Sequence, residues 1–210
     1  MDNNKLKLSL MLLMITVPIG LATIAFHYSE SFSGFGNTSE GHLLNPVVDI
    51  TALQLTDADN KPAYESFEAI AARVKPEDYK PRPWQVLYIG GASCDESCQQ
   101  RLYFLRQLHT RLAKEASRVE RVYVLTGDAE AALDATAQQW LQQAEMRVVH
   151  GSADTLAAVL KSKAAGEPIN EHYLYVMDPV GNIMLYFTPE QGPDAIFKDL
   201  KKLLASSGLG

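Results

Sequence analysis

The chain has 210 residues, of which 47% are hydrophobic and 21% are charged, and its net charge is −6 at pH 7. These proportions are those of an ordinary globular protein and exclude a disordered or fibrous chain. The acidic balance also excludes a nucleic-acid-binding class, because such domains carry a clustered excess of basic side chains.

The N-terminal segment is the most apolar part of the chain. Residues 8–26 carry no charged side chain, and Lys5 and Lys7 precede them. A run of this length is sufficient to span a bilayer, and the preceding lysines place the N-terminus on the cytoplasmic side. We therefore expect residues 1–28 to form a cytoplasmic N-terminus and one transmembrane helix. The expected location is the inner (plasma) membrane, with the remaining chain in the periplasm or otherwise outside the cytoplasm.

Two further regions follow the expected anchor. Residues 29–43 are rich in serine, glycine and polar side chains, which predicts a flexible tether. The folded domain is expected at 44–207. Short apolar stretches on both sides of the turn-forming residues 57–61 predict a β-hairpin within 47–64.

From residue 84 onward, strand and helix patterns alternate. Strands are expected at 84–90, 121–127 and 146–151 and in a hairpin over 172–187. Helices are expected from residue 94 and at 129–143, 152–163 and 194–207. This alternation predicts an α/β fold, a mixed sheet flanked by helices.

The only two cysteines, Cys94 and Cys98, follow the first of these strands. Ser93 and Glu96 have the spacing of a capping box, which predicts Ser93 as the N-cap and Cys94 as the first helical residue. Two helical residues four apart share a face and have Cα atoms about 6 Å apart, a distance compatible with a disulfide. A helix N-terminus also favours the thiolate form of a cysteine.

Three interpretations of the pair remain open: a structural disulfide, a redox pair and a metal site. A disulfide that closes so short a loop removes little entropy from the unfolded chain and is a weak staple. The carboxyl end of a sheet strand, where a helix begins, is the place where α/β folds carry their chemistry. This position favours a functional pair over a structural one.

The cysteine pair together with a late hairpin resembles the Sco/SenC family. The residues that carry the resemblance are the Cys-x-x-x-Cys motif at 94–98, the Tyr-x-x-Asp-Pro-x-Gly motif at 175–181 and His172 shortly before it. The similarity extends over roughly residues 44–205. It implies a thioredoxin-like fold and a membrane-anchored factor that assists copper-site assembly in cytochrome c oxidase. The implied partner is a cytochrome c oxidase subunit or another copper-site assembly protein.

The resemblance also implies a copper ion held by Cys94, Cys98 and His172. Soft thiolates select Cu(I), and an imidazole completes a three-coordinate site. The chain departs from the family at two positions: Gln99 stands where the family has proline, and the family's copper histidine aligns with Asn170. His150, at the end of a predicted strand, is a second candidate imidazole.

Two other functions fit the same residues. In a thiol–disulfide oxidoreductase, Cys94 attacks a partner's disulfide and Cys98 resolves the mixed disulfide. In a non-catalytic assembly scaffold, the pair has no chemical role. We expect the basic residues Arg101, Arg106 and Arg111 to form a solvent-exposed helix face.

Overall fold

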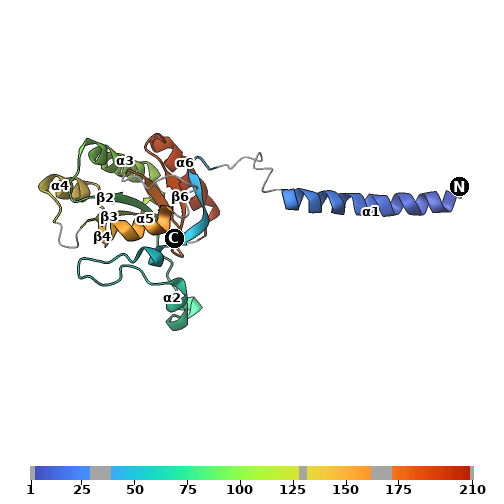
Figure 1. Cartoon of the computed structure of the whole chain (residues 1–210), viewed down its shortest axis with the longest axis horizontal. Helices are drawn as coiled ribbons and strands as arrows, with labels where there is room; N and C mark the ends of the chain where they lie inside the picture. Colours follow the sequence, from blue (N-terminus) through green and yellow to red (C-terminus); the bar gives the residue numbers. More distant parts are fainter. Residues whose placement is uncertain (1–2, 29–38, 128–131, 162–171, 209–210) are drawn as a thin grey trace. The chain divides into compact units, whose positions relative to one another are not determined.

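The computed structural model describes residues 3–28, 39–127, 132–161 and 172–208. The chain divides into two units, Met1–Thr38 and Ser39–Gly210. In the first unit, helix α1 covers Asn3–Tyr28 (Figure 1). Among the described residues, no helix combines the length and the hydropathy that a membrane crossing requires.

The second unit is built on a six-stranded sheet with the order β1-β6-β5-β2-β3-β4 (Figure 1). Strands β2, β3 and β4 are mutually parallel. On the other side of β2, the pairs β2–β5, β5–β6 and β6–β1 are antiparallel. The predicted mixed sheet is thus confirmed. The strands are β1 (His42–Asp49), β2 (Trp84–Gly90), β3 (Val119–Thr126), β4 (Arg147–Gly151), β5 (Leu174–Met177) and β6 (Asn182–Phe187).

Helices cover both faces of this sheet. Apolar side chains of α3, α4 and α6 form a buried cluster on one face, and those of α5 and the 3-10 helix η1 belong to the cluster on the other. Helix α2 buries none of its residues. The helices are η1 (Ile50–Leu53), α2 (Phe67–Arg73), η2 (Pro76–Asp78), α3 (Glu96–Leu112), η3 (Ala113–Arg118), α4 (Ala135–Gln143), α5 (Ala153–Lys161) and α6 (Pro193–Ser206).

Strand β2 is the central element that positions the cysteines. All seven of its residues are buried, including Gln85 within an otherwise apolar run, as this largely apolar sequence predicts. It pairs with β3 along its whole length and with β5 on its other side. Its carboxyl end at Gly90 therefore leads out of the middle of the sheet, directly into the cysteine loop.

The two predicted hairpins have different outcomes. The hairpin over 172–187 is confirmed as β5 and β6, joined by a turn in which the Asp178 carboxylate accepts hydrogen bonds from the amides of Val180, Gly181 and Asn182. Gly181 has φ +110°, which favours glycine at this position.

The hairpin predicted within 47–64 is wrong. Strand β1 pairs with β6, which is distant in the sequence, and the chain then enters η1, whose N-cap is Asp49. The turn at 57–61 does form, but Thr56 makes only isolated bridges, to Pro62 and to His150. A capped helical turn therefore interrupts the first arm of the expected hairpin.

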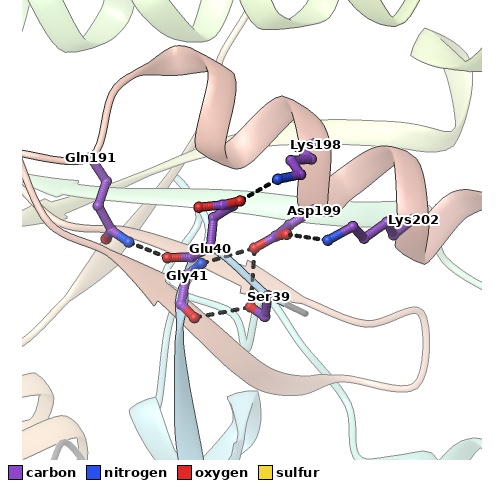
Figure 2. Close-up of polar contacts among 7 residues, drawn as sticks. All are labelled: Ser39, Glu40, Gly41, Gln191, Lys198, Asp199 and Lys202. Carbon is purple, nitrogen blue, oxygen red and sulfur yellow. Dashed lines mark hydrogen bonds and ion pairs between the residues drawn. The ribbon is translucent and has the colours of Figure 1, made fainter. Parts of the chain in front are cut away.

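The first residues of the domain are fastened to α6 by a buried carboxylate (Figure 2). Asp199 is 3% exposed and accepts hydrogen bonds from the Gly41 amide at 2.8 Å and the Ser39 hydroxyl at 3.0 Å. Lys198 pairs with Glu40 beside it. These contacts fix the point at which the chain enters the domain.

Candidate redox and metal site

Cys94 and Cys98 are joined by a disulfide at the carboxyl end of β2. Their Cα atoms are 5.2 Å apart, and each residue is 5% exposed. They belong to the buried cluster that α3, α4 and α6 form over the sheet. The sequence therefore predicted correctly that the two sulfurs lie together. Both cysteines are almost completely buried.

Helix α3 begins two residues later than the sequence predicts. Its N-cap is Asp95, not Ser93, and the Asp95 carboxylate accepts a hydrogen bond from the Cys98 amide at 2.9 Å. Cys94 thus precedes the helix, whereas Cys98 lies at its third position. Aspartate and serine are about equally good N-cap residues. In this structure it is the Asp95 side chain that accepts from the Cys98 amide.

Two side chains and one backbone amide, from three elements, hold the cysteine loop. The Gln99 amide donates to the Cys94 carbonyl at 3.0 Å, so the residue that replaces the family's proline ties the two ends of the motif together. The buried Tyr123 of β3 donates its hydroxyl to the Gly91 carbonyl at 2.7 Å. The Ala92 carbonyl accepts from the amide of Asp134, the N-cap of α4.

His172 lies beside α3 and is half-buried. Its Nδ1 is 3.4 Å from the hydroxyl of Tyr88 in β2. It lines a surface hollow together with Ser97 and Arg101, which flank Cys98 on α3. His172 and the first turns of α3 thus line the same hollow.

The three predicted copper ligands do not form a ligand group in the described part of the chain. Over residues 3–28, 39–127, 132–161 and 172–208, no three His, Cys, Asp or Glu side chains are arranged to hold a metal ion. The two sulfurs are bonded to each other, so ligation would first require their reduction. Asn170, which aligns with the family's histidine, lies outside the described residues. The copper site stays a prediction.

His150 and His109 have their contacts elsewhere in the domain. His150 exchanges two backbone hydrogen bonds with Thr56 and lines a different hollow, with Gly127 and Ser152. His109 contacts the Ala116 carbonyl at 3.1 Å, and burial lowers its pKa. His109 is therefore a boundary residue of α3.

The expected exposed basic face is wrong for one of its members. Arg106 is exposed, and Arg111 pairs with Asp194 at 2.7 Å. Arg101, however, is 7% exposed and lies over the ring of Phe104. The sequence spacing already indicates that Arg101 is buried. Arg101 follows Cys98 by three residues and so falls on the same, buried side of the helix.

A second hollow lies between α3 and α4, beside the same turn. Its walls include Ser97 and Gln99 of the motif region and two aromatic side chains, Tyr103 and Trp140. Tyr103 is 53% exposed. The disulfide is thus flanked on one side by an aromatic surface and on the other by the hollow that contains His172.

This geometry agrees with the comparison with protein families. Residues 84–207, more than half of the chain, match the family described as the transmembrane-like, thioredoxin-like, C-terminal domain. The chain belongs to this family. The thioredoxin-like fold predicted from the sequence is therefore confirmed, and the matched segment begins at β2 and includes both cysteines and His172.

Solved structures of the Sco/SenC class and of a thiol exchange protein are also similar. Copper-bound ScoI from Bradyrhizobium japonicum is 18% identical, with 77% of this chain and 98% of that chain covered and a TM-score of 0.45. Copper-bound yeast Sco1 is 13% identical, with 82% and 96% covered and a TM-score of 0.48. A thiol:disulfide interchange protein from Bacteroides sp. is 15% identical, with 80% and 91% covered and a TM-score of 0.42.

A search of curated proteins finds no match. Similarity to solved structures at these identities does not by itself assign copper binding or thiol exchange to this chain.

Proposed function

We propose that the domain exchanges thiols and disulfides with a partner protein through Cys94 and Cys98. The observation that carries this proposal is the disulfide at the amino end of α3, at the exit of the central strand of a thioredoxin-like sheet. Because Cys94 lies in the loop before α3, we expect the bond to open and close without unfolding of the domain. The flanking aromatic surface, with Tyr103 and Trp140, suits the docking of a polypeptide.

The exchange proceeds in two steps. In the reduced protein, the Cys94 thiolate attacks one sulfur of the partner's disulfide, so that a mixed disulfide forms and a partner thiolate leaves. The Cys98 thiolate then attacks the Cys94 sulfur and releases the second partner thiolate. The partner gains two electrons, and the Cys94–Cys98 bond forms. Cys94 is the attacking group because it precedes the helix, whereas the helical turn holds Cys98.

The test is exchange between the reduced full-length protein and an oxidised two-cysteine peptide. We expect stoichiometric reduction of the peptide by the wild type. Cys98→Ser should accumulate the mixed disulfide, and Cys94→Ser should react at least about tenfold more slowly. The proposal is wrong if the wild type does not reduce the peptide, or if the two variants behave alike.

Copper handling is a second candidate, favoured by the position of His172 beside the helix turn that carries Cys98. Here the reduced sulfurs and the imidazole hold Cu(I) as cargo for a cytochrome c oxidase subunit or another copper-site assembly protein. Anaerobic Cu(I) titration of the reduced protein and of His172→Ala tests it. Equal affinity in both proteins would remove His172 from the site, and no binding by the reduced wild type would exclude copper handling.

Membrane attachment through residues 1–28 remains part of the proposal for the full chain. Its support is the uncharged sequence of residues 8–26. Attachment predicts that the protein sediments with membranes after washing in high salt and carbonate, with its cysteines accessible only from the non-cytoplasmic side. Recovery in the soluble fraction would contradict it.

A further inference from the structure

The hollow beside the disulfide has the features of an anion site. It has a volume of about 250 Å³ and lies between the first turns of α3 and the start of α6. Its walls are Ser97, Gln100, Arg101 and Phe104 of α3, His172, and the segment with Pro189, Gln191, Gly192 and Pro193. A space of this size holds several water molecules, since each occupies about 30 Å³ in the liquid.

Arg101 is the unsatisfied group in this hollow. The residue is only 7% exposed. Its buried Nη2 atom nevertheless has no hydrogen-bond partner among the described residues. Burial lowers the pKa of Arg101, but a guanidinium keeps its charge at neutral pH. A buried guanidinium nitrogen without a hydrogen-bond partner is costly, so an anion that accepts from it would stabilise Arg101.

The start of α6 contributes a second positive element to the same hollow. Its N-cap is Gly192, which has no side chain that could cap the helix, and Pro193 occupies the first turn. The N-terminus of a 14-residue helix attracts anions through its dipole and its backbone N–H groups. The acidic residue of this turn, Asp194, is paired with Arg111.

Two other polar side chains near Arg101, Gln191 and Glu190, have partners of their own. The Gln191 side chain accepts from the Thr188 amide at 2.8 Å and donates to the Glu40 carbonyl (Figure 2), so it fixes the wall of the hollow. Glu190 is exposed, and a hydrogen bond with the Thr188 side chain lowers the pKa of its carboxyl group. Glu190 attracts Arg101 electrostatically but is not part of the wall.

We propose that this hollow binds a carboxylate, with Arg101 as its charged partner and the start of α6 as its second donor. One full and one partial positive charge match a singly charged carboxylate better than a phosphate, which carries nearly two charges. The carboxylate belongs to an acidic side chain of the protein that exchanges disulfides with Cys94–Cys98, a step that rests on the proposed function. Ser97 and Arg101 place the site on the helix turn that carries Cys98.

The first experiment measures anion binding without any redox step. Sodium acetate is titrated into the oxidised full-length protein in neutral detergent at constant ionic strength, and the NMR signals of the Gly192 amide and the Arg101 Nε–H group are followed. Saturable shifts are expected. Arg101→Gln should weaken acetate binding about tenfold or more, and Arg101→Lys should retain part of it.

Arg106→Gln is the matched control, because it removes the same charge from an exposed position of the same helix. It should leave the acetate affinity within about twofold of the wild type. Glu190→Gln should strengthen binding by removing a competing negative charge. Non-saturable shifts in the wild type, or equal effects of Arg101→Gln and Arg106→Gln, would overturn the proposal.

The second experiment identifies the source of the carboxylate. Two oxidised two-cysteine peptides that differ only by an aspartate or an asparagine next to a cysteine are reduced by the wild type and by Arg101→Gln. The aspartate peptide should react several-fold faster with the wild type, and Arg101→Gln should abolish the difference. Acetate binding with equal peptide rates would overturn the peptide source and leave a free small carboxylate. If neither peptide reacts, the thiol-exchange function fails while the anion site stands on the acetate result.

Discussion

Helices α3 and α4 begin in the same way, but only the start of α3 carries a cysteine. At α3, the Asp95 carboxylate accepts from the amide of Cys98 at 2.9 Å, and at α4, the Asp134 carboxylate accepts from the amide of Ala137 at 2.6 Å. The two starts are also neighbours, because the Asp134 amide donates to the Ala92 carbonyl of the cysteine loop.

An aspartate N-cap alone therefore does not distinguish the start of α3 from that of α4. Both carboxylates satisfy the amide of the third helical residue, but that residue is a cysteine in α3 and an alanine in α4. The α3 start also receives the chain directly from the buried strand β2 and places Cys94 before the cap. The Asp95 cap therefore stabilises the helix and, at the same time, adds a negative charge near the sulfurs.

The largest effect on stability is expected where β2 enters the cysteine loop. A Cβ atom at Gly90 would lie 2.3 Å from the Tyr123 hydroxyl oxygen, whereas one at Gly91 would meet nothing within 4 Å. Gly90→Ala should lower the free energy of unfolding by about 1–3 kcal/mol because the overpacked core must shift. Gly91→Ala should change it far less. Urea unfolding of both variants would contradict this contrast if the losses were equal.

Removal of either N-cap aspartate should lower the stability by a similar amount, but the two variants should differ in the reduction potential of the cysteine pair. Asp95→Ala and Asp134→Ala should each lower the free energy of unfolding by about 1 kcal/mol. Only Asp95→Ala should change the reduction potential of the Cys94–Cys98 pair. Thiol labelling in glutathione buffers measures the potential. A shift of equal size in Asp134→Ala would show that the cap acts through general stability, not through its position beside the sulfurs.

A smaller effect separates the charge of Asp95 from its hydrogen bond. Asp95→Asn keeps a capping oxygen but removes the negative charge that opposes a thiolate. In the reduced protein, the pKa of the Cys98 thiol should fall by roughly half a unit. The pH dependence of alkylation by iodoacetamide reports this pKa. Asp134→Asn is the control, and no difference between the two variants would argue against the electrostatic effect.

The smallest expected effect lies toward the far end of α3, at His109. Burial lowers its pKa in the folded protein below the usual value of about 6.5, so the unfolded chain binds a proton more readily. Stability should therefore fall as the pH decreases below about 6.5 and level off below the folded-state pKa. His109→Gln should flatten this part of the stability curve. An unchanged slope in urea unfolding between pH 7 and 5 would contradict the assignment.

Much of the fold follows from local patterns that the structure confirms. The largely apolar run of β2 indicates a central strand, and the turn at Asp178–Asn182 indicates the β5–β6 hairpin. The proximity of Cys94 and Cys98 follows from their spacing alone. Each of these features is specified within a short stretch of sequence.

The features that the sequence did not predict depend on contacts between distant segments. Strand β1 pairs with β6 instead of forming a local hairpin. Local sequence patterns did not reveal this pairing because the two strands are more than 130 residues apart. Arg101 lines a hollow together with Pro189 and Gln191, which are about 90 residues away in the sequence. The choice of Asp95 over Ser93 as the N-cap is local, but both residues satisfy the same pattern. Spacing alone cannot decide between two good caps.

The reduction potential of Cys94–Cys98 in the folded full-length protein tests the central claim most directly. The protein is equilibrated in glutathione buffers of defined ratio, and the free thiols are counted by mass-shift labelling. Thiol exchange predicts one reversible two-electron transition, with a potential in the range of about −120 to −270 mV found for exchange proteins. A pair that stays oxidised at every ratio, with a potential below about −300 mV, would be a structural disulfide and would contradict the account.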